Sequence, residues 1–495
     1  MNMYSFDGFG LLSSAGTIWI AVDWIIRIGA LFVVPRNRKP SSGTAWLMVI
    51  FLFPIGGLLA YIVFGSPKLP KGRREAQKTL DSIIEQTFAH FRKNHDTQKL
   101  LKARVPDEHV QLARLSESLS HLPPLDGNAV QLLSEYDDAI ASIARDIDAA
   151  EHYVHLEYFI IVMDEVTEPI FTALARAKKR GVNVRVMYDA FGTRGYPNRK
   201  KMLARLKADE ISVQKILPFK LPGRGYVRPD LRNHRKLVVI DGHTGYTGSQ
   251  NLVKSSYHRR DSLYYDELVV RLQGPVVLEL SAVFISDWYS ETGSTLGFKD
   301  LGTQPSAIRA YGSSLAQVLP SGPGYDDENN LKLFTQLIHS AKRRITIINP
   351  YFVPDEALTT AIISAARRGI DVKMINSEAM DQLLVGHAQR SFYEALLKAG
   401  VKIYLYDAPI VLHSKFITVD DDISTIGSSN LDIRSFWLNL EVTLITYDPA
   451  VVTELRKVES RYLKRSRQII LADWQARPRR KILLDNLARL TSAVQ

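Results

Sequence analysis

The stretch NHRKLVVID, residues 233–241, sets a His and a Lys two positions apart at the head of an aliphatic run that closes on an Asp. A second stretch, HSKFITVD at residues 413–420, repeats this H-x-K-x4-D spacing. LVVI and FITV are short and rich in aliphatic or β-branched residues, which predicts buried β-strands. The repetition therefore predicts two copies of one strand-based unit.

The sequence around the two stretches is also duplicated. Residues 147–186 and 338–374 each predict an amphipathic helix end, a β-rich strand, an acidic turn, a second helix that closes on Arg-Gly, and another strand. The Gly fits a helix C-cap, where a positive φ is favoured. Strands alternating with helices over this length predict two duplicated α/β sheet domains rather than short solenoid repeats.

Further polar residues follow each H-x-K-x4-D stretch in the same order. A Gly/Ser turn carries an Asn, and a Glu then precedes an aliphatic strand. The candidate site residues are His234, Lys236, Asp241, Ser249, Asn251 and Glu267 in the first copy, and His413, Lys415, Asp420, Ser428, Asn430 and Glu441 in the second. One such motif arises easily by chance, but its repetition with the same downstream residues favours a catalytic role over a structural one.

The spacing predicts how these side chains lie. Residues i and i+2 of a strand share a face, so the His and Lys of each copy should emerge side by side. The Asp stands at an odd separation from the His, and we expect it mainly to hydrogen-bond the backbone of a turn. Two such units packed face to face place two imidazoles and two ammonium groups around one cavity that suits a tetrahedral phosphate. One His then attacks phosphorus to form a covalent phosphohistidine, and the other exchanges protons with the leaving and incoming alcohols.

The remaining candidates support this chemistry. Glu267 and Glu441 are expected to accept the Nδ1 proton of a His and fix its tautomer; the alternative partner is a cation such as Arg434. The Ser and Asn side chains are expected to bind non-bridging phosphate oxygens. His155 and Glu157 are weaker candidates for the pocket wall. Since the lysines supply positive charge, we expect neither metal nor cofactor, and the absence of cysteine excludes Cys-ligated zinc.

Two apolar runs open the chain, at about residues 11–34 and 45–64. Each approaches the roughly 20 residues that span a bilayer, which predicts a membrane hairpin of two hydrophobic helices. Asp23 and Arg27 stand four positions apart in the first run and are expected to neutralise each other. The basic cluster after the second run is larger than the one between the runs, which favours the cytoplasm for the main domain. A shallow or re-entrant hairpin is the alternative.

The net charge of +11 indicates an anionic partner, either nucleic acid or an anionic membrane surface, and the hairpin favours the membrane. The C-terminal ARPRRKILLDNLARL predicts a helix that packs on the domain, with a membrane-surface helix as the alternative. The expected segments are a membrane hairpin at 1–67, a basic helical juxtamembrane linker at 68–125, a first domain at 126–292, an inter-domain linker at 293–330, and a second domain with a C-terminal helix at 331–495.

The duplicated H-x-K-x4-D with GSxN resembles the phospholipase D superfamily. RNHRKLVVIDG, NPYFVPDEAL, GSSNLDIRSFWLNLEV and the apolar AWLMVIFLFPIGGLLAYIVFG are similar to bacterial cardiolipin synthases of the membrane-anchored type. The resemblance covers about residues 12–475. The sequence departs from the family's pattern in two places: GSQNLVKSS after the first motif, and the polar stretch at residues 375–378.

This resemblance implies two phospholipase D-like domains and a transphosphatidylation. One phosphatidylglycerol passes its phosphatidyl group to the enzyme and releases glycerol, and a second takes that group through its glycerol hydroxyl to form cardiolipin. It implies His234 as the nucleophile and His413 as the acid/base. It also implies phosphatidylglycerol and cardiolipin as partners and a multi-pass location in the bacterial inner membrane. The membrane hairpin argues against nucleic acid as a partner. Homodimerisation, lipid hydrolysis, transfer to another alcohol, nuclease activity and a non-catalytic membrane scaffold stay open.

Overall fold

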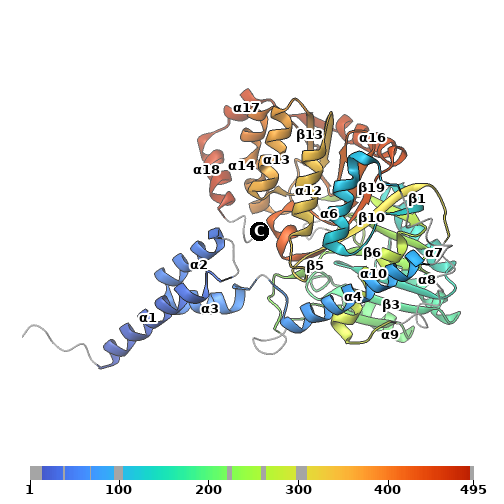
Figure 1. Cartoon of the computed structure of the whole chain (residues 1–495), viewed down its shortest axis with the longest axis horizontal. Coiled ribbons are helices and arrows are strands. Elements are labelled where there is room, and N and C mark those ends of the chain that lie inside the picture. Colours follow the sequence, from blue (N-terminus) through green and yellow to red (C-terminus); the bar gives the residue numbers. More distant parts are fainter. Residues whose placement is uncertain are drawn as a thin grey trace, which may run out of the picture.

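The computed structural model describes residues 14–36, 40–66, 68–93, 104–219, 226–257, 263–296 and 309–490. Three N-terminal helices project from a body of two α/β halves (Figure 1). They are α1 (Ser14–Val33), α2 (Pro40–Leu52) and α3 (Pro54–Phe64). Residues 11–13 of the first apolar run, and the basic residues 38 and 39 of the link, lie outside the described residues.

The second apolar run forms two helices where one was expected. Pro54 lacks an N–H and its ring clashes with the preceding turn, so α2 ends at Leu52 and Pro54 opens α3. The helices then pack closely: a Cβ at Gly57 would lie 2.7 Å from the Cα of Ile50. In α1, Arg27 and Asp23 form the expected ion pair at 3.0 Å. Among the described residues, no helix combines the length and the apolar character needed to cross a membrane.

The segment after α3 runs along both halves. It contains α4 (Lys71–Lys93), the 3-10 helix η1 (Asp107–His109) and α6 (Val110–Ser120). Gln77 of α4 accepts a hydrogen bond from Ser286 of the first half, whereas Ala113 of α6 accepts one from Gln317 of the second. The stretch expected to be a juxtamembrane linker therefore also ties the two halves together.

Each half follows the duplicated order that the sequence predicts. The first half contains β1 (Leu125–Leu133), α7 (Tyr136–Asp148), β2 (Tyr153–Tyr158), α8 (Glu168–Lys179), β3 (Asn183–Asp189), α9 (Arg199–Ala208), β4 (Ser212–Ile216), β5 (Arg232–Asn233), β6 (Lys236–Ile240), β7 (Thr244–Gly248), β8 (Tyr264–Asp266), β9 (Val269–Gln273) and α10 (Val277–Thr292). Gly181 ends the α8 segment at φ +91°, as expected for a C-cap glycine.

The second half repeats these elements. It contains β10 (Ser314–Ser321), α12 (Asn329–Ser340), β11 (Arg344–Ile348), β12 (Phe352–Val353), α13 (Glu356–Arg367), β13 (Asp371–Ser377), α14 (Leu383–Ala399), β14 (Lys402–Tyr406), β15 (Ile410–Leu412), β16 (Phe416–Val419), β17 (Ile423–Gly427), β18 (Leu431–Asp432), α15 (Ile433–Trp437), β19 (Asn439–Thr446), α16 (Pro449–Lys464), β20 (Ser466–Gln468), α17 (Leu471–Gln475) and α18 (Arg479–Arg489).

The strand order shows the duplication directly. The first half is ordered β4-β3-β2-β6-β7-β9-β1 and the second β14-β13-β11-β16-β17-β19-β10. In each half the first two neighbouring pairs are parallel and the remaining pairs are antiparallel. The edge strands β1 and β10 pair with each other, so the two halves share one continuous 16-stranded sheet.

The halves nonetheless meet face to face. One hydrophobic cluster combines Leu237 and Val270 of the first half with Val318 and Leu444 of the second. Two further clusters lie between the outer faces and their helices, one under α7 and α8 and the other under α12, α13 and α14. Helices α10 and α16 also contribute to the central cluster, so helices cover both faces of the sheet in each half and the shared core lies at the centre.

Part of the stretch that we expected to be an inter-domain linker is a central strand. Residues 314–321 form β10, which is buried throughout and pairs with β19 and β1. Pro320 is tolerated there, and the strand still contributes Ala316, Val318 and Leu319 to the two cores. The Gly- and Ser-rich composition of its surroundings concealed this apolar run. Residues 297–308 of the same stretch lie outside the described part.

Candidate active site

Two short strands carry the histidines from one half to the other. β5 pairs in parallel with the start of β19, and β15 pairs in parallel with β8. The backbone N of His234 donates to the carbonyl of Leu440 at 2.8 Å, and that of His413 donates to the carbonyl of Asp266 at 2.8 Å. Each histidine is thus anchored to the residue that precedes the glutamate of the opposite half.

The two imidazoles pair with these opposite glutamates. Nδ1 of His234 lies 3.0 Å from Oε1 of Glu441, and Nδ1 of His413 lies 2.8 Å from Oε1 of Glu267. Arg434, the alternative partner considered for a glutamate, instead donates to the carbonyl of Asp230. A carboxylate that accepts the Nδ1 proton fixes the tautomer and leaves Nε2 for chemistry. The sequence predicted the type of contact, but not that it crosses between halves.

The lysines contact the backbone of the histidines. Nζ of Lys236 donates to the carbonyl of His234 at 2.7 Å, and Nζ of Lys415 donates to that of His413 at 2.6 Å. In the first half, His234 and Lys236 both lie beside the ring of Phe159, as expected for side chains that emerge side by side, but the two residues do not share one strand. β6 begins only at Lys236 and β16 only after Lys415, so each His-x-Lys lies where the chain passes from the bridging strand to the core strand.

Burial sets the protonation of the site. It lowers the pKa of His234 to about 4, although Glu441 opposes the shift. It also lowers the pKa of His413 against the opposing effect of Glu267. Lys415 of the second half contributes to the first shift and Lys236 of the first half to the second. Since each imidazole responds to the lysine of the other half, the four groups form one site.

The pKa values of the lysines and of the glutamates are all lowered, but for different reasons. Burial lowers the pKa of Lys236 to about 7 and that of Lys415 to about 8. Burial alone would raise the pKa of Glu441 and Glu267, but their histidines and the neighbouring lysines hold both below the ordinary value. The carboxylates are therefore charged near neutral pH, whereas the lysines are poised to be fully charged when an anion binds.

The predicted substrate-binding serines lie beside the glutamates. Oγ of Ser428 donates to Oε2 of Glu441 at 2.5 Å, and the hydroxyl of Ser249 lowers the pKa of Glu267 through a hydrogen bond. Oγ of Ser249 also donates to the carbonyl of Leu268 at 3.3 Å, so both hydroxyls bond protein groups instead of pointing freely at a phosphate.

The two asparagines of the Gly/Ser turns differ in their bonding. Oδ1 of Asn251 accepts a hydrogen bond from the backbone of Ile160. Oδ1 of Asn430 is buried without a hydrogen-bond partner among the described residues. The sequence did not distinguish them, because both occupy the same position in their copies.

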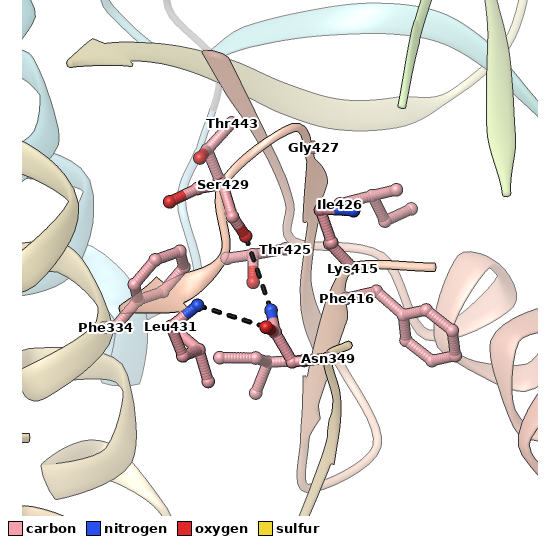
Figure 2. A pocket seen from close by; sticks show the side chains of 11 residues that line it. Phe334, Asn349, Lys415, Phe416, Thr425, Ile426, Gly427, Ser429, Leu431 and Thr443 are labelled. Carbon is pink, nitrogen blue, oxygen red and sulfur yellow. Dashed lines mark hydrogen bonds between the residues drawn. The ribbon is translucent and has the colours of Figure 1, made fainter. Parts of the chain in front are cut away.

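The second Gly/Ser turn is held by Asn349, a residue that sequence reasoning missed. Its amide donates to the carbonyl of Ser429 at 3.4 Å, and its Oδ1 accepts from the backbone of Leu431 at 3.1 Å (Figure 2). A small cavity of about 10 Å³ lies beside it, lined also by Lys415 and Thr425. The NPYF stretch at the end of a predicted strand was the available signal for this role.

The aspartates of the two motifs close turns. The carboxylate of Asp241 accepts three backbone N–H groups, from residues 151, 152 and 153, at 2.7–2.8 Å. That of Asp420 accepts three from residues 342, 343 and 344 at 2.8–3.0 Å. Both have positive φ, at 50° and 48°. They lie at the ends of β6 and β16 that are opposite to the lysines, and they join each core strand to the preceding helix–strand turn.

Different aromatic side chains line the two histidines. The ring of Phe159 lies 5.1 Å from that of His234. The rings of Tyr265 and Tyr351 lie 5.5 and 6.0 Å from that of His413, and both hydroxyls donate to Asp381. The His234 side is therefore more apolar and the His413 side more polar.

The residues next to the histidines are also asymmetric. The buried guanidinium of Arg235 donates to the carbonyl of Glu441 at 3.0 Å and pairs with Asp287. In the second half the equivalent residue is Ser414, which bonds Tyr462 at 2.8 Å. These supporting partners lie far along the chain, and no local pattern indicated them.

The weaker candidates for the pocket wall lie in different places. His155 is fully buried and its ring stacks on that of Phe284 at 4.2 Å, so it belongs to the packing under α10. Glu157 accepts a hydrogen bond from the amide of Asn233 at 2.6 Å and thus contacts the neighbour of His234.

Two similar α/β halves that each contribute a His and a Lys to one site define a phospholipase D-like protein. The family model described as "Cardiolipin synthase, PLD-like domain" matches residues 143–288 and 334–462, and the one described as "Phospholipase_D-nuclease N-terminal" matches residues 16–66. The chain belongs to the cardiolipin synthase family. The match to two segments agrees with the duplication seen in the strand order.

Known relatives extend along almost the whole chain. Cardiolipin synthase A of Proteus mirabilis is 32% identical over 94% of this chain and 95% of its own length. That of Klebsiella pneumoniae is 32% identical over 93% of this chain and 96% of its own length. The structure of phosphatidylserine synthase from Haemophilus influenzae matches 77% of this chain and 99% of its own, with a TM-score of 0.59 and 16% identity. That likeness reports the fold.

Proposed function

We propose that this protein is a cardiolipin synthase that transfers a phosphatidyl group between two phosphatidylglycerol molecules. The relatives named above carry this activity in their names and align over nearly the whole chain. The observation that carries the proposal is the pair of crossed His–Glu contacts, because they give one phosphate two oriented imidazoles and two lysines.

In the first step, we assign attack on phosphorus to Nε2 of His234. Its low pKa keeps it neutral and therefore nucleophilic. The N–P bond forms while the bond from phosphorus to the glycerol oxygen breaks. His413, protonated with the help of the phosphate's negative charge, gives its proton to that oxygen and glycerol leaves. Lys236 and Lys415 neutralise the non-bridging oxygens.

In the second step, His413 is the base. Its Nε2 takes the proton from a glycerol hydroxyl of the second phosphatidylglycerol, and that oxygen attacks phosphorus. The N–P bond breaks, His234 is released, and cardiolipin forms. Glu441 and Glu267 stabilise each imidazole while it carries positive charge. We assign Asp241 and Asp420 to the support of the two core strands.

The proposed location is the bacterial inner membrane, with α1–α3 as the anchor and the catalytic body on the cytoplasmic side. The high apolar content of α1–α3 and the match of residues 16–66 to the N-terminal family model support an anchor. The proposed catalytic body consists of two domains, with residues 126–292 and 331–495 as their main parts and β10 joining them.

Reconstitution of the purified protein with phosphatidylglycerol as the sole lipid tests the function. Cardiolipin and glycerol in equal amounts support the proposal. Phosphatidic acid as the only lipid product indicates a hydrolase instead. Absence of turnover of phosphatidylglycerol, and of phosphatidylglycerol mixed with phosphatidylethanolamine, favours a non-catalytic scaffold.

A further inference from the structure

The C-terminal helix α18 leaves its apolar side uncovered. Asp485 and Ala488 are buried against the body, and Asp485 bonds His387 of α14 at 2.7 Å. The leucines at positions 483, 484, 487 and 490 are 51–81% exposed. At 100° per residue, 483, 487 and 490 share the side of the helix opposite to the buried residues. The helix therefore packs on α14 through Asp485, Ala488 and Arg489, and presents its leucines outward.

Two exposed leucines of α14 extend this surface. Leu383 and Leu384 are 73% and 58% exposed. His387, which contacts α18, lies one turn after Leu383, so these leucines border the first turns of α18. We call the set the leucine patch, and its members are Leu383, Leu384, Leu483, Leu484, Leu487 and Leu490.

The leucine patch begins close to residues that contact His413. Leu383 follows Asp381 by two residues, and Asp381 accepts hydrogen bonds from the tyrosines whose rings contact His413. In the first half, Phe191 and Phe219 are 61% and 63% exposed and follow the carboxyl ends of β3 and β4. In both halves, large exposed apolar side chains thus follow the carboxyl ends of parallel strands.

The N-terminal helices reach the same region. The carbonyls of Val63 and Phe64, at the end of α3, accept hydrogen bonds from Tyr226 and Arg228, which shortly precede His234. Pro40 of α2 lines a surface groove with Glu356, at the start of α13. In Figure 1, α18 lies at the side of the second half toward α2. The proposed anchor therefore contacts the chain shortly before His234, and α18 lies toward this anchor.

Charge identifies what covers the leucine patch. Arg479, Arg480 and Lys481 form the exposed first turn of α18, and Asp485 is the one acidic residue of this helix and is buried. Leucines flanked by basic residues suit the interface of an anionic bilayer, where the apolar side chains enter the acyl region and the cations contact phosphates.

We propose that the leucine patch docks into the surface of an anionic phospholipid bilayer and holds the active-site entrance against it. This inference rests on the proposed function, because a lipid that stays in its bilayer must bring its headgroup to His413 and His234. It adds a second membrane contact, at the opposite end of the chain from α1–α3.

The absence of cysteine allows a direct test in the full chain. Leu487→Cys carries an environment-sensitive fluorophore, and Lys207→Cys on α9, an exposed position in the other half, is the matched control. Both proteins are reconstituted in vesicles of phosphatidylglycerol and phosphatidylcholine. The probe at 487 should shift to the blue and be quenched by nitroxide-labelled lipids, whereas the probe at 207 should show neither effect.

Charge and apolar variants separate the two contributions. Arg479→Glu with Arg480→Glu should reduce the quenching at 487, whereas Lys200→Glu with Lys201→Glu on α9 should leave it unchanged. Leu483→Ser with Leu484→Ser should lower turnover of phosphatidylglycerol in vesicles by about tenfold, through the lost apolar area, but not in detergent micelles.

Three outcomes overturn the proposal. A probe at 487 as exposed to water as that at 207 excludes docking, and one shielded from water but not reached by nitroxide lipids indicates a second copy on the patch. Quenching at 487 that is the same in phosphatidylcholine alone excludes the anionic requirement. The probe reports docking without any turnover, so the two proposals can fail separately. A probe exposed to water, together with normal cardiolipin formation, refutes only the docking. A probe quenched by nitroxide lipids, without any turnover, refutes only the proposed function.

Discussion

The carboxylate of Glu441 lies 3.0 Å from Nδ1 of His234, although the two residues stand 207 positions apart and belong to different halves. The reciprocal contact joins Glu267 to His413 at 2.8 Å. Each half therefore supplies a histidine and a lysine to its own part of the site and a carboxylate to the other. Neither half alone holds an oriented histidine, which gives a physical reason for the two copies to remain on one chain.

The crossed carboxylates should be essential for the rate. We expect Glu441→Gln and Glu267→Gln each to lower kcat by about a thousandfold, because a neutral amide neither stabilises an imidazolium nor enforces the tautomer. Ser428→Ala, which removes one hydrogen bond to Glu441, should cost about tenfold. Steady-state assays on vesicles compare kcat of the three variants with that of the unchanged protein. Equal rates for Glu441→Gln and the unchanged protein would contradict the role.

Both histidines should be required for any turnover. His234→Ala removes the attacking nitrogen, and His413→Ala removes the proton donor of the first step. Exchange of labelled glycerol into phosphatidylglycerol reports that step alone and should fall to background in both variants. Acid-labile phosphate bound to the protein should form in the unchanged enzyme and be absent from His234→Ala. Retained exchange in either variant would refute a shared site.

The acid and alkaline limbs of the pH profile of kcat/KM should be shifted by the lowered pKa values of the buried site residues. A lowered pKa keeps His234 neutral until about pH 4, so the acid limb should lie near 4 instead of near the ordinary histidine value. His413 must be protonated in the first step and its pKa is lowered from the ordinary value, so kcat/KM should already decline below about pH 6.5. The lowered pKa of Lys236, about 7, and of Lys415, about 8, means that their charge is also lost as pH rises, so the decline should steepen between about 7 and 8.

Arginine provides the control for the alkaline limb. In Lys236→Arg the guanidinium keeps its charge at every pH of the assay, so the part of the alkaline fall due to this residue should disappear from whatever activity the variant retains. An acid limb near 6.5 in the unchanged protein would show that the histidines are not shielded by burial as the structure indicates.

The motif aspartates should matter for stability. Asp241→Ala leaves three backbone N–H groups without their acceptor, and we expect a loss of about 3 kcal/mol. Asp241→Gly loses the same bonds but accommodates the φ of 50° without strain, so it should cost about 1 kcal/mol less. Thermal unfolding of the detergent-solubilised protein compares them. A larger loss for Gly than for Ala would argue against the backbone explanation.

Local patterns in the sequence predicted much of the fold. The aliphatic runs after the lysines are β6 and β16, the Arg-Gly pairs end α8 and α13, and the duplicated order appears in both halves. These features depend on side-chain periodicity and on the conformational preference of glycine, which act over a few residues. The exception within this range was β10, whose apolar positions were hidden among turn-forming residues.

The sequence by itself determined the candidate site residues, because two copies of the same spacing with the same downstream Ser, Asn and Glu are visible in the linear chain. Only the tertiary structure decided that Glu441 serves His234 and Glu267 serves His413, and that Asn349, Asp287 and Tyr462 support them. The physical reason is that β5 and β15 leave their own half and pair with strands of the other. Such pairing is set by backbone hydrogen bonds between distant segments, which no local periodicity records.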